Sequence, residues 1–380
     1  MTAECGQSRR TRLPDRNFWS GRRVLLTGHT GFKGSWLAVW LHDLGARVTG
    51  LSLSPDTEPS LYRLAELDDR VASHIGDIRD PKCVADVVAA AEPEVVLHLA
   101  AQALVRRSYE DPLETFSTNV HGTGILLDAL RPVESLTATV VVTSDKVYRN
   151  REWIHPYRET DELGGHDPYS ASKAAAEHVA DSFRLSFFGP ANRGLATARA
   201  GNVIGGGDWA PERLIPDAVR AWQSGESLQV RRPGATRPWQ HVLEPLCGYL
   251  VLAETIAADP ALAGAFNLGP APDTDTSVRS VIEMASRWWA GPDRPEAEAA
   301  PVDWARSESG PHEANRLSLD PTKAARSLGV RPVWSVQTAV ERSFAWYRKQ
   351  AEGESALVLC RNDIAAFVET ASQPDAQVVS

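Results

Sequence analysis

Short apolar runs alternate with longer amphipathic runs along the first half of the chain. This alternation is typical of parallel strands that are joined by helical crossovers. The predicted strands are residues 22–27, 47–52, 95–99, 139–143 and 195–200, and the predicted helices are residues 34–44, 80–91, 111–130 and 170–187. Right-handed crossovers place the carboxyl ends of such strands at one edge of the sheet. The pattern therefore predicts an α/β fold, a doubly wound parallel sheet with a ligand site at that edge.

The pattern changes after residue 200, where a Gly-Gly-Gly-Asp-Trp turn opens a stretch rich in Pro, Arg and Trp. We expect this stretch to belong to a smaller C-terminal α+β lobe that binds the substrate, while a helix at 244–257 and a strand at 265–268 return to the main sheet. The expected parts are a flexible N-terminal tail at 1–17, a main domain at 18–200 and about 240–270, the smaller lobe at about 201–239 and 271–350, and a C-terminal extension at 351–380.

The composition excludes several classes of protein. Among 380 residues, 40 Lys and Arg face 49 Asp and Glu, a net charge of −9, so no global basic field is available for nucleic acid. No apolar stretch approaches the roughly 18 residues that a membrane span needs, and no apolar segment follows the N-terminal arginines as in a secretory signal. The four cysteines form no C-x-x-C pair. We therefore expect free thiols, no metal site and a cytoplasmic protein.

A glycine-rich segment follows the first predicted strand and opens the first predicted helix. Gly28 permits a tight turn, Gly31 lets the backbone approach a pyrophosphate, and Gly34 allows the helix to pack closely on the strand. Since the helix N-terminus faces the anion, the segment favours a dinucleotide site over a turn without a ligand. The expected contacts are Gly28, Thr30, Gly31, Phe32, Lys33 and Gly34.

The choice between NAD and NADP stays open at this point. The second predicted strand ends in Leu-Ser-Leu-Ser at 51–54, with no acidic residue to hold a ribose 2′-hydroxyl. Asp77, followed by Ile78, is a candidate for the adenine side of the cofactor. The alternative for Asp77 is a solvated turn aspartate.

Tyr169 and Lys173 are four residues apart on a predicted helix, so the phenol and the ammonium share one face. A cation beside a phenol lowers the phenol pKa and makes phenolate available as a base near neutral pH. A surface pair would have the same spacing. Together with the dinucleotide segment, however, this pair indicates a catalytic base and its supporting cation.

These motifs together resemble the extended short-chain dehydrogenase/reductase superfamily, over about residues 19–350. The segment Leu-His-Leu-Ala-Ala-Gln at 97–102 resembles its fourth-strand motif, where small residues let the cofactor pass close to the backbone. The resemblance implies a Rossmann-type domain that binds NAD, with further cofactor contacts from Leu99, Ala100, Ala101, Gln102, Asn119 and Thr143. His98 is either a core histidine or a catalyst, and its place in a buried strand favours the core.

Ser144, Asp145 and Lys146 follow the central predicted strand, where a polar strand end can also simply begin a loop. Sugar-nucleotide 4,6-dehydratases of the superfamily have a hydroxyl residue, an acid and a third proton-transfer residue here. The Ser-Asp-Lys form looks like that of the CDP-glucose 4,6-dehydratases, whereas the dTDP-glucose enzymes have Thr-Asp-Glu. Segments 29–36, 105–109, 157–169, 199–209 and 237–242 resemble the CDP-glucose type as well. The resemblance implies the catalytic set Ser144, Asp145, Lys146, Tyr169 and Lys173.

The same resemblance implies the ligands and the assembly. The reaction would convert CDP-glucose to CDP-4-dehydro-6-deoxyglucose and water by C4 oxidation, elimination across C5 and C6, and hydride return to C6. Arg237 suits a diphosphate, because a guanidinium bonds two phosphate oxygens at once. The residues implied for the sugar nucleotide are Arg106, Ser144, Asn202, Arg213, Leu214, Ile215, Pro216, Arg231, Arg237, His312 and Glu313. The superfamily usually assembles through two helices of each chain, so we expect a homodimer or a higher homo-oligomer.

Three alternatives stay open. An NAD-dependent sugar-nucleotide epimerase would share the fold, but C4 inversion needs no acid at C6, so Asp145 and Lys146 argue against it. A dehydratase of another nucleotide sugar would share the catalytic residues, because one sequence does not reveal the base pocket. A non-catalytic dinucleotide sensor is disfavoured by the presence of Tyr169 and Lys173. The role of Lys146 is also open, since a lysine acts as a base only where its pKa is lowered.

Overall fold

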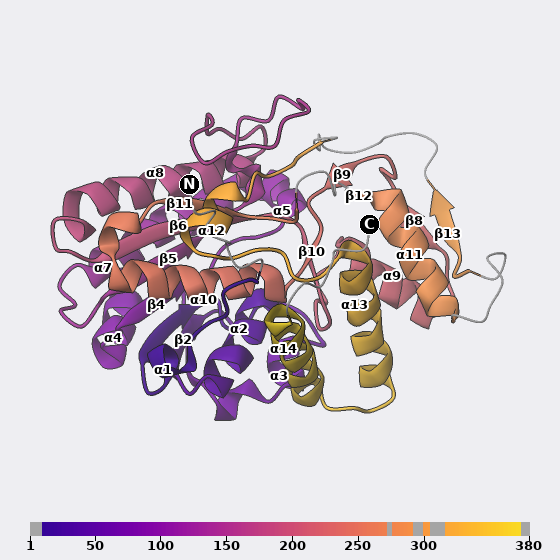
Figure 1. Cartoon of the computed structure of the whole chain (residues 1–380), viewed down its shortest axis with the longest axis horizontal. Coiled ribbons are helices and arrows are strands. Elements are labelled where there is room, and N and C mark those ends of the chain that lie inside the picture. Colours follow the sequence, from indigo (N-terminus) through magenta and orange to yellow (C-terminus); the bar gives the residue numbers. More distant parts are fainter. Residues whose placement is uncertain (1–9, 272–275, 292–298, 305–315, 374–380) are drawn as a thin grey trace, which may run out of the picture.

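A seven-stranded parallel sheet forms the centre of the molecule, in the order β11-β6-β5-β4-β1-β2-β3 (Figure 1). The structure, a computed structural model, describes residues 10–271, 276–291, 299–304 and 316–373. The strands are β1 (Arg23–Thr27), β2 (Arg47–Ser52), β3 (Ala72–Ile75), β4 (Val95–His98), β5 (Ala138–Val142), β6 (Gly194–Ala200) and β11 (Ala265–Leu268). This arrangement confirms the predicted doubly wound α/β fold.

Helices cover both faces of the sheet. Successive residues of β1 alternate between two apolar clusters, with Val24 and Leu26 in one and Leu25 in the other. The first cluster packs against α2 (Phe32–Asp43) and α10 (Leu243–Ala258), and the second against α4 (Pro81–Ala91), α7 (Thr123–Leu130) and α8 (Pro168–Phe183). Because both sides of the central strands β4, β5 and β6 are buried, these strands read as mostly apolar runs.

The order of the strands fixes where a ligand can bind. β1 pairs with β2 on one side and with β4 on the other, so the chain reverses its direction across the sheet at β1. The carboxyl ends of β1 and β4 therefore border an open crevice. The glycine-rich segment lies at this point, between β1 and α2.

Two predicted helices are interrupted in the structure. The predicted helix 111–130 consists of α6 (Pro112–Phe116), a π-helical turn (Ser117–Gly122) and α7. The predicted helix 170–187 ends in a second π-helical turn (Arg184–Phe188) after α8.

The sequence pattern also missed β3, since its residues are partly or fully exposed and carry no apolar alternation.

The smaller lobe lies beside the sheet, on the right in Figure 1. It contains α9 (Leu214–Gln223), β8 (Leu228–Val230), α11 (Val278–Ala290), β13 (Val302–Trp304) and α13 (Val336–Ala351). β8 pairs in parallel with β13, and β9 (Thr236–Arg237) pairs antiparallel with β12 (Thr276–Ser277). The remaining described α-helices and strands are α1 (Arg16–Trp19), α3 (Leu61–Leu64), α5 (Val105–Glu110), β7 (Val203–Ile204), β10 (Gln240–His241), α12 (Thr322–Ser327) and α14 (Ala356–Ser372), and short 3-10 helices lie at Leu67–Asp69, Asp145–Val147 and Pro260–Leu262.

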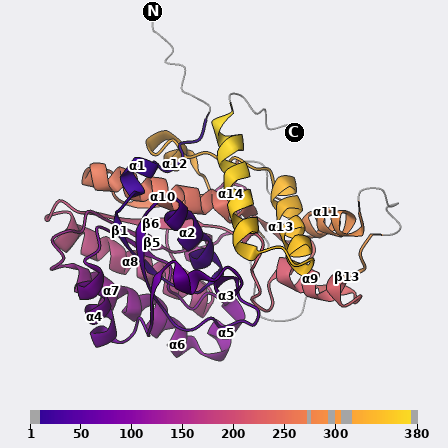
Figure 2. The same ribbon diagram turned by 90° about the horizontal axis from the view of Figure 1, so that it is seen from below.

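Both ends of the described chain pack onto the main domain. Arg12 Nη2 donates to Glu254 Oε2 of α10 at 2.8 Å, and the Asp15 amide donates to Glu254 Oε1 at 2.7 Å. These contacts lie within the segment that the sequence assigns to a flexible tail, so part of that segment is held against α10. α14 runs beside α13 and reaches α2 (Figure 2). No described helix is both long enough and apolar enough to cross a membrane.

Candidate active site

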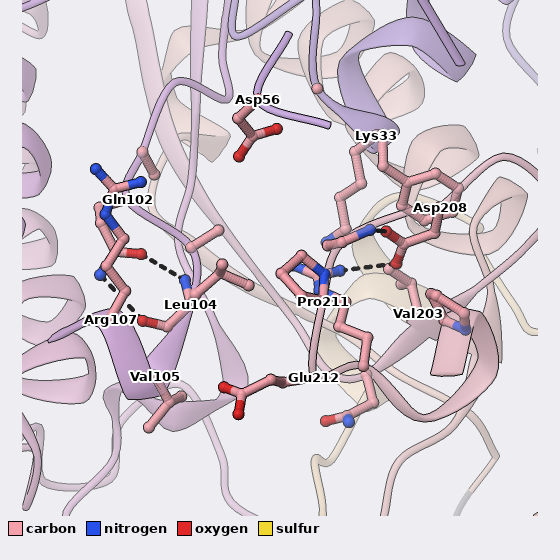
Figure 3. Close-up of a pocket in the computed structure, with 18 of the residues that line it drawn as sticks. Lys33, Asp56, Gln102, Leu104, Val105, Arg107, Val203, Asp208, Pro211 and Glu212 are labelled. Atoms are coloured by element: carbon pink, nitrogen blue, oxygen red, sulfur yellow. Dashed lines mark hydrogen bonds and ion pairs between the residues drawn. The ribbon is translucent and has the colours of Figure 1, made fainter. Parts of the chain in front are cut away.

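A cavity of about 630 Å³ opens at the carboxyl ends of the strands, between the main sheet and the smaller lobe. Figure 3 shows Gln102 and Leu104 on one side of it and Lys33 and Asp208 on the other. The predicted residues that line it are Gly28, Thr30, Gly31, Phe32, Lys33, Gly34, Asp77, Ile78, Leu99, Ala100, Ala101, Gln102, Arg106, Thr143, Ser144, Asp145, Lys146, Tyr169, Lys173, Asn202, Arg213, Leu214, Ile215, Pro216, Arg231 and Arg237.

Three predicted site residues are not among them. Asn119 lies behind the cavity wall, where its amide bonds the backbone of Gln102 and the Ser172 hydroxyl. It therefore orients the loop after β4 and makes no direct contact with the cavity. His312 and Glu313 lie outside the described residues. His98, by contrast, is confirmed as a core histidine, since its ring nitrogens bond Thr27 and Thr123.

The glycine-rich segment forms a tight cradle. Gly28 has φ +77°, and a Cβ there would lie 2.7 Å from the Ala100 nitrogen. A Cβ on Gly34 would lie 2.0 Å from the Gly28 carbonyl oxygen, so both positions require glycine for packing. At Gly31, the N-cap of α2, a Cβ would meet only an ordinary contact at 3.5 Å. The free space at Gly31 thus leaves the helix N-terminus open to an anion.

The loop after β2 carries a carboxylate, Asp56, that the predicted site did not include. Thr30 Oγ1 lies 2.8 Å from Ser52 Oγ and 2.8 Å from the Leu53 carbonyl, which holds the glycine-rich segment against that strand end. Asp56 follows in the next loop and lines the cavity, and Figure 3 shows its carboxylate directed inward. Sequence spacing missed it because the residue stands beyond the strand rather than at its last position.

Asp77 is already engaged by a neighbour. Arg79 donates to Asp77 Oδ2 from Nε at 2.9 Å and from Nη2 at 2.6 Å, and this pairing lowers the pKa of Asp77. Both residues line the cavity at the end of β3. Asp77 therefore lines the cavity as half of an ion pair, and its assignment to the adenine side of the cofactor stays a prediction.

Ser144 and Asp145 form the centre of the predicted catalytic set. Ser144 Oγ donates to Asp145 Oδ1 at 2.9 Å. Asp145 is 2% exposed, and its Oδ2 is buried with no hydrogen-bond partner among the described residues. Burial raises the pKa of Asp145, against the lowering effects of Lys146 and the Ser144 hydroxyl. An acid with a raised pKa and a free oxygen at a cavity wall is suited to donate a proton.

Tyr169 lies beside Ser144, but its ionisation differs from the sequence expectation. Burial raises the pKa of the phenol to about 12, although a hydrogen bond with Ser144 opposes the rise. Lys173 Nζ donates to the Val142 carbonyl at 3.1 Å. Burial also lowers the pKa of Lys173 to about 8. The expected lowering of the phenol pKa by the cation is therefore wrong for the protein alone.

Two further lysines reach the cluster. Lys146 places Nζ 6.0 Å from the Tyr169 ring centroid. Lys33 extends from the first turn of α2 toward Tyr249, whose hydroxyl accepts from Nζ at 3.5 Å. Burial, together with the charges of Arg213 and Lys173, lowers the pKa of Lys33 to about 7. Lys33 therefore lies close enough to Asp145 for their charges to interact, while the sequence assigned it to the cofactor.

Three arginines that the sequence assigns to the sugar nucleotide form ion pairs with carboxylates. Asp208 Oδ2 lies 3.2 Å from Arg213 Nη1, at the start of α9. Across the cavity mouth, Glu212 Oε1 lies 2.6 Å from Arg106 Nη1 and 3.9 Å from Arg231 Nη2. Arginines so paired have their guanidinium groups already ordered for an anionic ligand. Neither carboxylate was among the predicted site residues, although Asp208 stands in the Gly-Gly-Gly-Asp-Trp turn at 205–209.

Comparison with known proteins places the chain in a family. A family model described as GDP-mannose 4,6 dehydratase matches residues 25–343. The CDP-glucose 4,6-dehydratase of Salmonella typhimurium is 45% identical over 366 residues, which cover 94% of this chain and 99% of that protein. A dTDP-glucose 4,6-dehydratase of Xanthomonas campestris is 29% identical over 339 residues, which cover 85% and 92%.

Solved sugar-nucleotide epimerases share the fold. The UDP-glucuronic acid 4-epimerase of Bacillus cereus, solved with UDP-glucuronic acid and NAD, has a TM-score of 0.73 at 20% identity, over 86% of this chain and 99% of that chain. The UDP-glucose 4-epimerase of Thermotoga maritima has a TM-score of 0.73 at 21% identity over the same shares. With a family model that spans most of the sequence and a relative of 45% identity along nearly all of it, the chain belongs to the GDP-mannose 4,6-dehydratase family.

Proposed function

We propose that this chain is an NAD-dependent CDP-glucose 4,6-dehydratase, a hydro-lyase that forms CDP-4-dehydro-6-deoxyglucose and water. One observation carries the proposal: Asp145 Oδ2 is buried without a partner among the described residues, beside Ser144 and Tyr169. A redox site alone needs a base such as Tyr169, whereas loss of water needs an acid as well. The buried carboxyl supplies that acid.

The cavity residues fit NAD. The backbone at Gly28 and Gly31 and the N-terminus of α2 would hold the pyrophosphate. Asp56 would favour a ribose hydroxyl over a phosphate, since a carboxylate accepts hydrogen bonds and repels anions. When bound, NAD would take a hydride from sugar C4 and return it to C6, so the overall reaction is redox-neutral.

The residues of the chain move the protons. Tyr169 accepts the proton of the C4 hydroxyl, and the resulting C4 ketone makes the C5 proton acidic. Lys146 is the candidate base for the C5 proton, while Asp145 protonates the C6 hydroxyl, which leaves as water. The same base returns a proton to C5. Ser144, bonded to both Tyr169 and Asp145, then offers a path for the proton on Tyr169 to restore Asp145.

The relatives support cytidine as the base. The protein at 45% identity is named for CDP-glucose, whereas the dTDP-glucose enzyme is at 29%. Trp209 and Trp239 line the cavity, and one of them would border the base. A UDP-sugar epimerase is the second candidate, because such enzymes share the fold. The buried acid argues against it.

The variant Asp145→Asn tests the assignment of the acid. It keeps the shape and the hydrogen bond from Ser144 but cannot donate a carboxyl proton, so water formation should fall by about 10²-fold or more. C4 oxidation should persist, and reduced nicotinamide should accumulate in its absorbance band after CDP-glucose is added. A variant that forms the product at the wild-type rate would contradict the role. Asp86→Asn, an exposed carboxylate of α4 outside the cavity, is the control.

We further propose that the chain forms a homodimer. Leu113 is 80% exposed on α6, with Tyr109 (40%) and Phe116 (38%) nearby in sequence. Large apolar side chains that gather on one surface usually mark an interaction site. α6 packs on α8, so two copies that meet here would bring both helices of each chain together.

A further inference from the structure

A buried ion pair lies behind the catalytic residues. The Glu177 and Arg199 side chains are each 4% exposed, and Arg199 Nη2 donates to Glu177 Oε2 at 2.8 Å. Glu177 stands on α8 and Arg199 on β6, so the pair joins a helix to the sheet. Desolvation offsets much of the attraction in such a pair, which makes stability alone a weak reason for its presence. Its other contacts point to the active site.

The pair anchors both ends of the catalytic segment 143–148. At the start, Thr143 Oγ1 donates to Glu177 Oε1 at 2.5 Å. At the end, Arg199 Nη1 donates to the Tyr148 hydroxyl at 2.9 Å, and the guanidinium carbon lies 5.1 Å from the Tyr148 ring centroid. Ser144, Asp145 and Lys146 lie between these anchors. A small displacement of either anchor would therefore move the acid and the candidate base together.

Glu177 also acts on Lys173. It lies four residues after Lys173, just as Lys173 lies four after Tyr169, so the three side chains follow one helix face. Burial lowers the pKa of Lys173, and the charge of Glu177 opposes that change.

None of the other described groups named here as facing Lys173 carries a negative charge that would stabilise its ammonium. Lys33 on α2 repels the ammonium. His98 on β4 is neutral, because burial lowers its pKa to about 3. Val142 on β5 offers a carbonyl, and Arg199 on β6 lies on the far side of Glu177.

We propose that Glu177, held by Arg199, is a positioning residue that fixes the catalytic segment at Thr143 and keeps Lys173 charged during the reaction. The inference rests on the proposed function, because it gives Glu177 a task in that same site. It adds a second layer, from the ion pair to Thr143 and Lys173, behind the residues that face the ligands.

The variant Glu177→Gln tests the inference in the full-length protein. It should lower kcat about tenfold or more while the KM for CDP-glucose changes less than about threefold, because the residue touches no ligand. The alkaline limb of the kcat profile should move to lower pH by about one unit, since Lys173 loses a nearby opposite charge. The pH dependence of NAD affinity, followed by tryptophan fluorescence, should shift in the same direction.

Two companion variants separate positioning from folding. Thr197→Val removes another hydrogen bond to Glu177 Oε2 but no charge, so its pH profiles should match the wild type. If Glu177→Gln fails to fold because Arg199 is left unpaired, the double variant Glu177→Gln/Arg199→Gln removes both charges and is measured instead.

Unchanged pH profiles in a folded Glu177 variant, with kcat within about twofold of the wild type, would overturn the inference. If the wild type does not convert CDP-glucose, the proposed function fails, and the pH dependence of NAD affinity still decides the role of Glu177. A shift confined to the Glu177 variants supports it, and identical NAD profiles in all variants overturn it.

Discussion

At the scale of single residues, burial decides the ionisation of the groups that face the cavity. It raises the pKa of Asp145, raises that of Tyr169 to about 12 and lowers that of Lys173 to about 8. Sequence motifs identified all three as candidates, because the motifs record which residue types the chemistry needs. The depth of each side chain below the surface is not encoded in the spacing of one motif. The phenol pKa is therefore raised by burial, whereas the motif alone led us to expect a lowered value.

Alanine at Gly31 and at Gly34 should have opposite consequences. Gly31→Ala meets only the ordinary 3.5 Å contact, so its Tm should stay within a few degrees, but its affinity for NAD should fall about tenfold because the Cβ occupies the cradle. Gly34→Ala meets the Gly28 carbonyl oxygen at 2.0 Å and should lose about 1–3 kcal/mol of stability. Calorimetric titration and thermal unfolding check these results. Normal NAD binding by Gly31→Ala would place the cofactor elsewhere.

At the scale of elements, the sequence predicted the buried strands well and the half-exposed elements poorly. The ranges predicted for β5 and β6 match the structure to within one residue at each end, because both strands are fully buried and stand out as mostly apolar runs. The interruption at Ser117–Gly122 was not predicted, since a π-helical turn hardly changes the spacing of apolar residues. The site residues from loops, such as Asp56 and Glu212, were missed because no periodic pattern places loop residues.

Glu244 at the start of α10 should make stability depend on pH. Its carboxyl accepts from the Val333 and Trp334 amides, and burial raises its pKa from 4.5 to about 8. The folded state then holds a proton that the unfolded state releases, so this stability is complete below about pH 4.5 and is lost as pH rises toward 8. Between these pH values, the free energy of unfolding falls by about 1.4 kcal/mol per pH unit.

The variant Glu244→Gln should remove that contribution. Its free energy of unfolding, from denaturant titrations, should approach and then exceed that of the wild type as pH rises from about 5 to 8. Burial also raises the pKa of Asp363 to about 7. The free energy of unfolding of the variant therefore still falls with pH, but less steeply than that of the wild type. A difference between the two proteins that stays constant with pH would show that Glu244 is ionised throughout.

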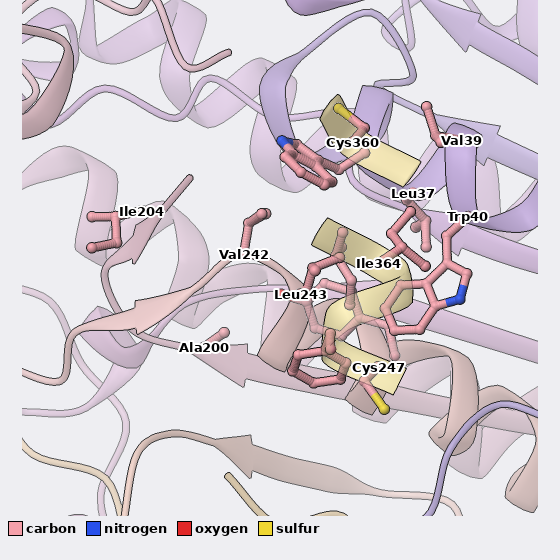
Figure 4. Close-up of a cluster of buried hydrophobic side chains, with 14 of the residues drawn as sticks. Leu37, Val39, Trp40, Ala200, Ile204, Val242, Leu243, Cys247, Cys360 and Ile364 are labelled. Carbon is pink, nitrogen blue, oxygen red and sulfur yellow. The ribbon is translucent and has the colours of Figure 1, made fainter. Parts of the chain in front are cut away.

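At the scale of the whole molecule, distant segments complete one core. Figure 4 shows Cys360 and Ile364 of α14 near Leu37 and Trp40 of α2 and Leu243 of α10, and all five belong to one buried cluster. Arg361 adds an ion pair to Asp43, with Nη2 2.6 Å from Oδ1. The sequence showed an amphipathic run here but not its partner, because contacts between distant segments leave no local pattern.

The proposed homodimer makes a prediction at this scale. Leu113→Asp places a charge on the exposed face of α6 and should convert the dimer to a monomer, as read by light scattering after size exclusion. Its Tm at high dilution should match the wild type, because Leu113 is 80% exposed in the single chain. A Leu113→Asp protein that stays dimeric would move the interface to another surface.

Product formation from four nucleotide sugars tests the proposed function most directly. Purified protein with NAD is mixed separately with CDP-glucose, dTDP-glucose, UDP-glucose and GDP-mannose. The molecular mass of each product is then measured by mass spectrometry. We predict that CDP-glucose alone yields a product lighter by one water, with the alkaline absorbance of a 4-keto-6-deoxy sugar. An isomer of unchanged mass would identify an epimerase and contradict the role of Asp145, and water loss from another sugar nucleotide would contradict the choice of cytidine.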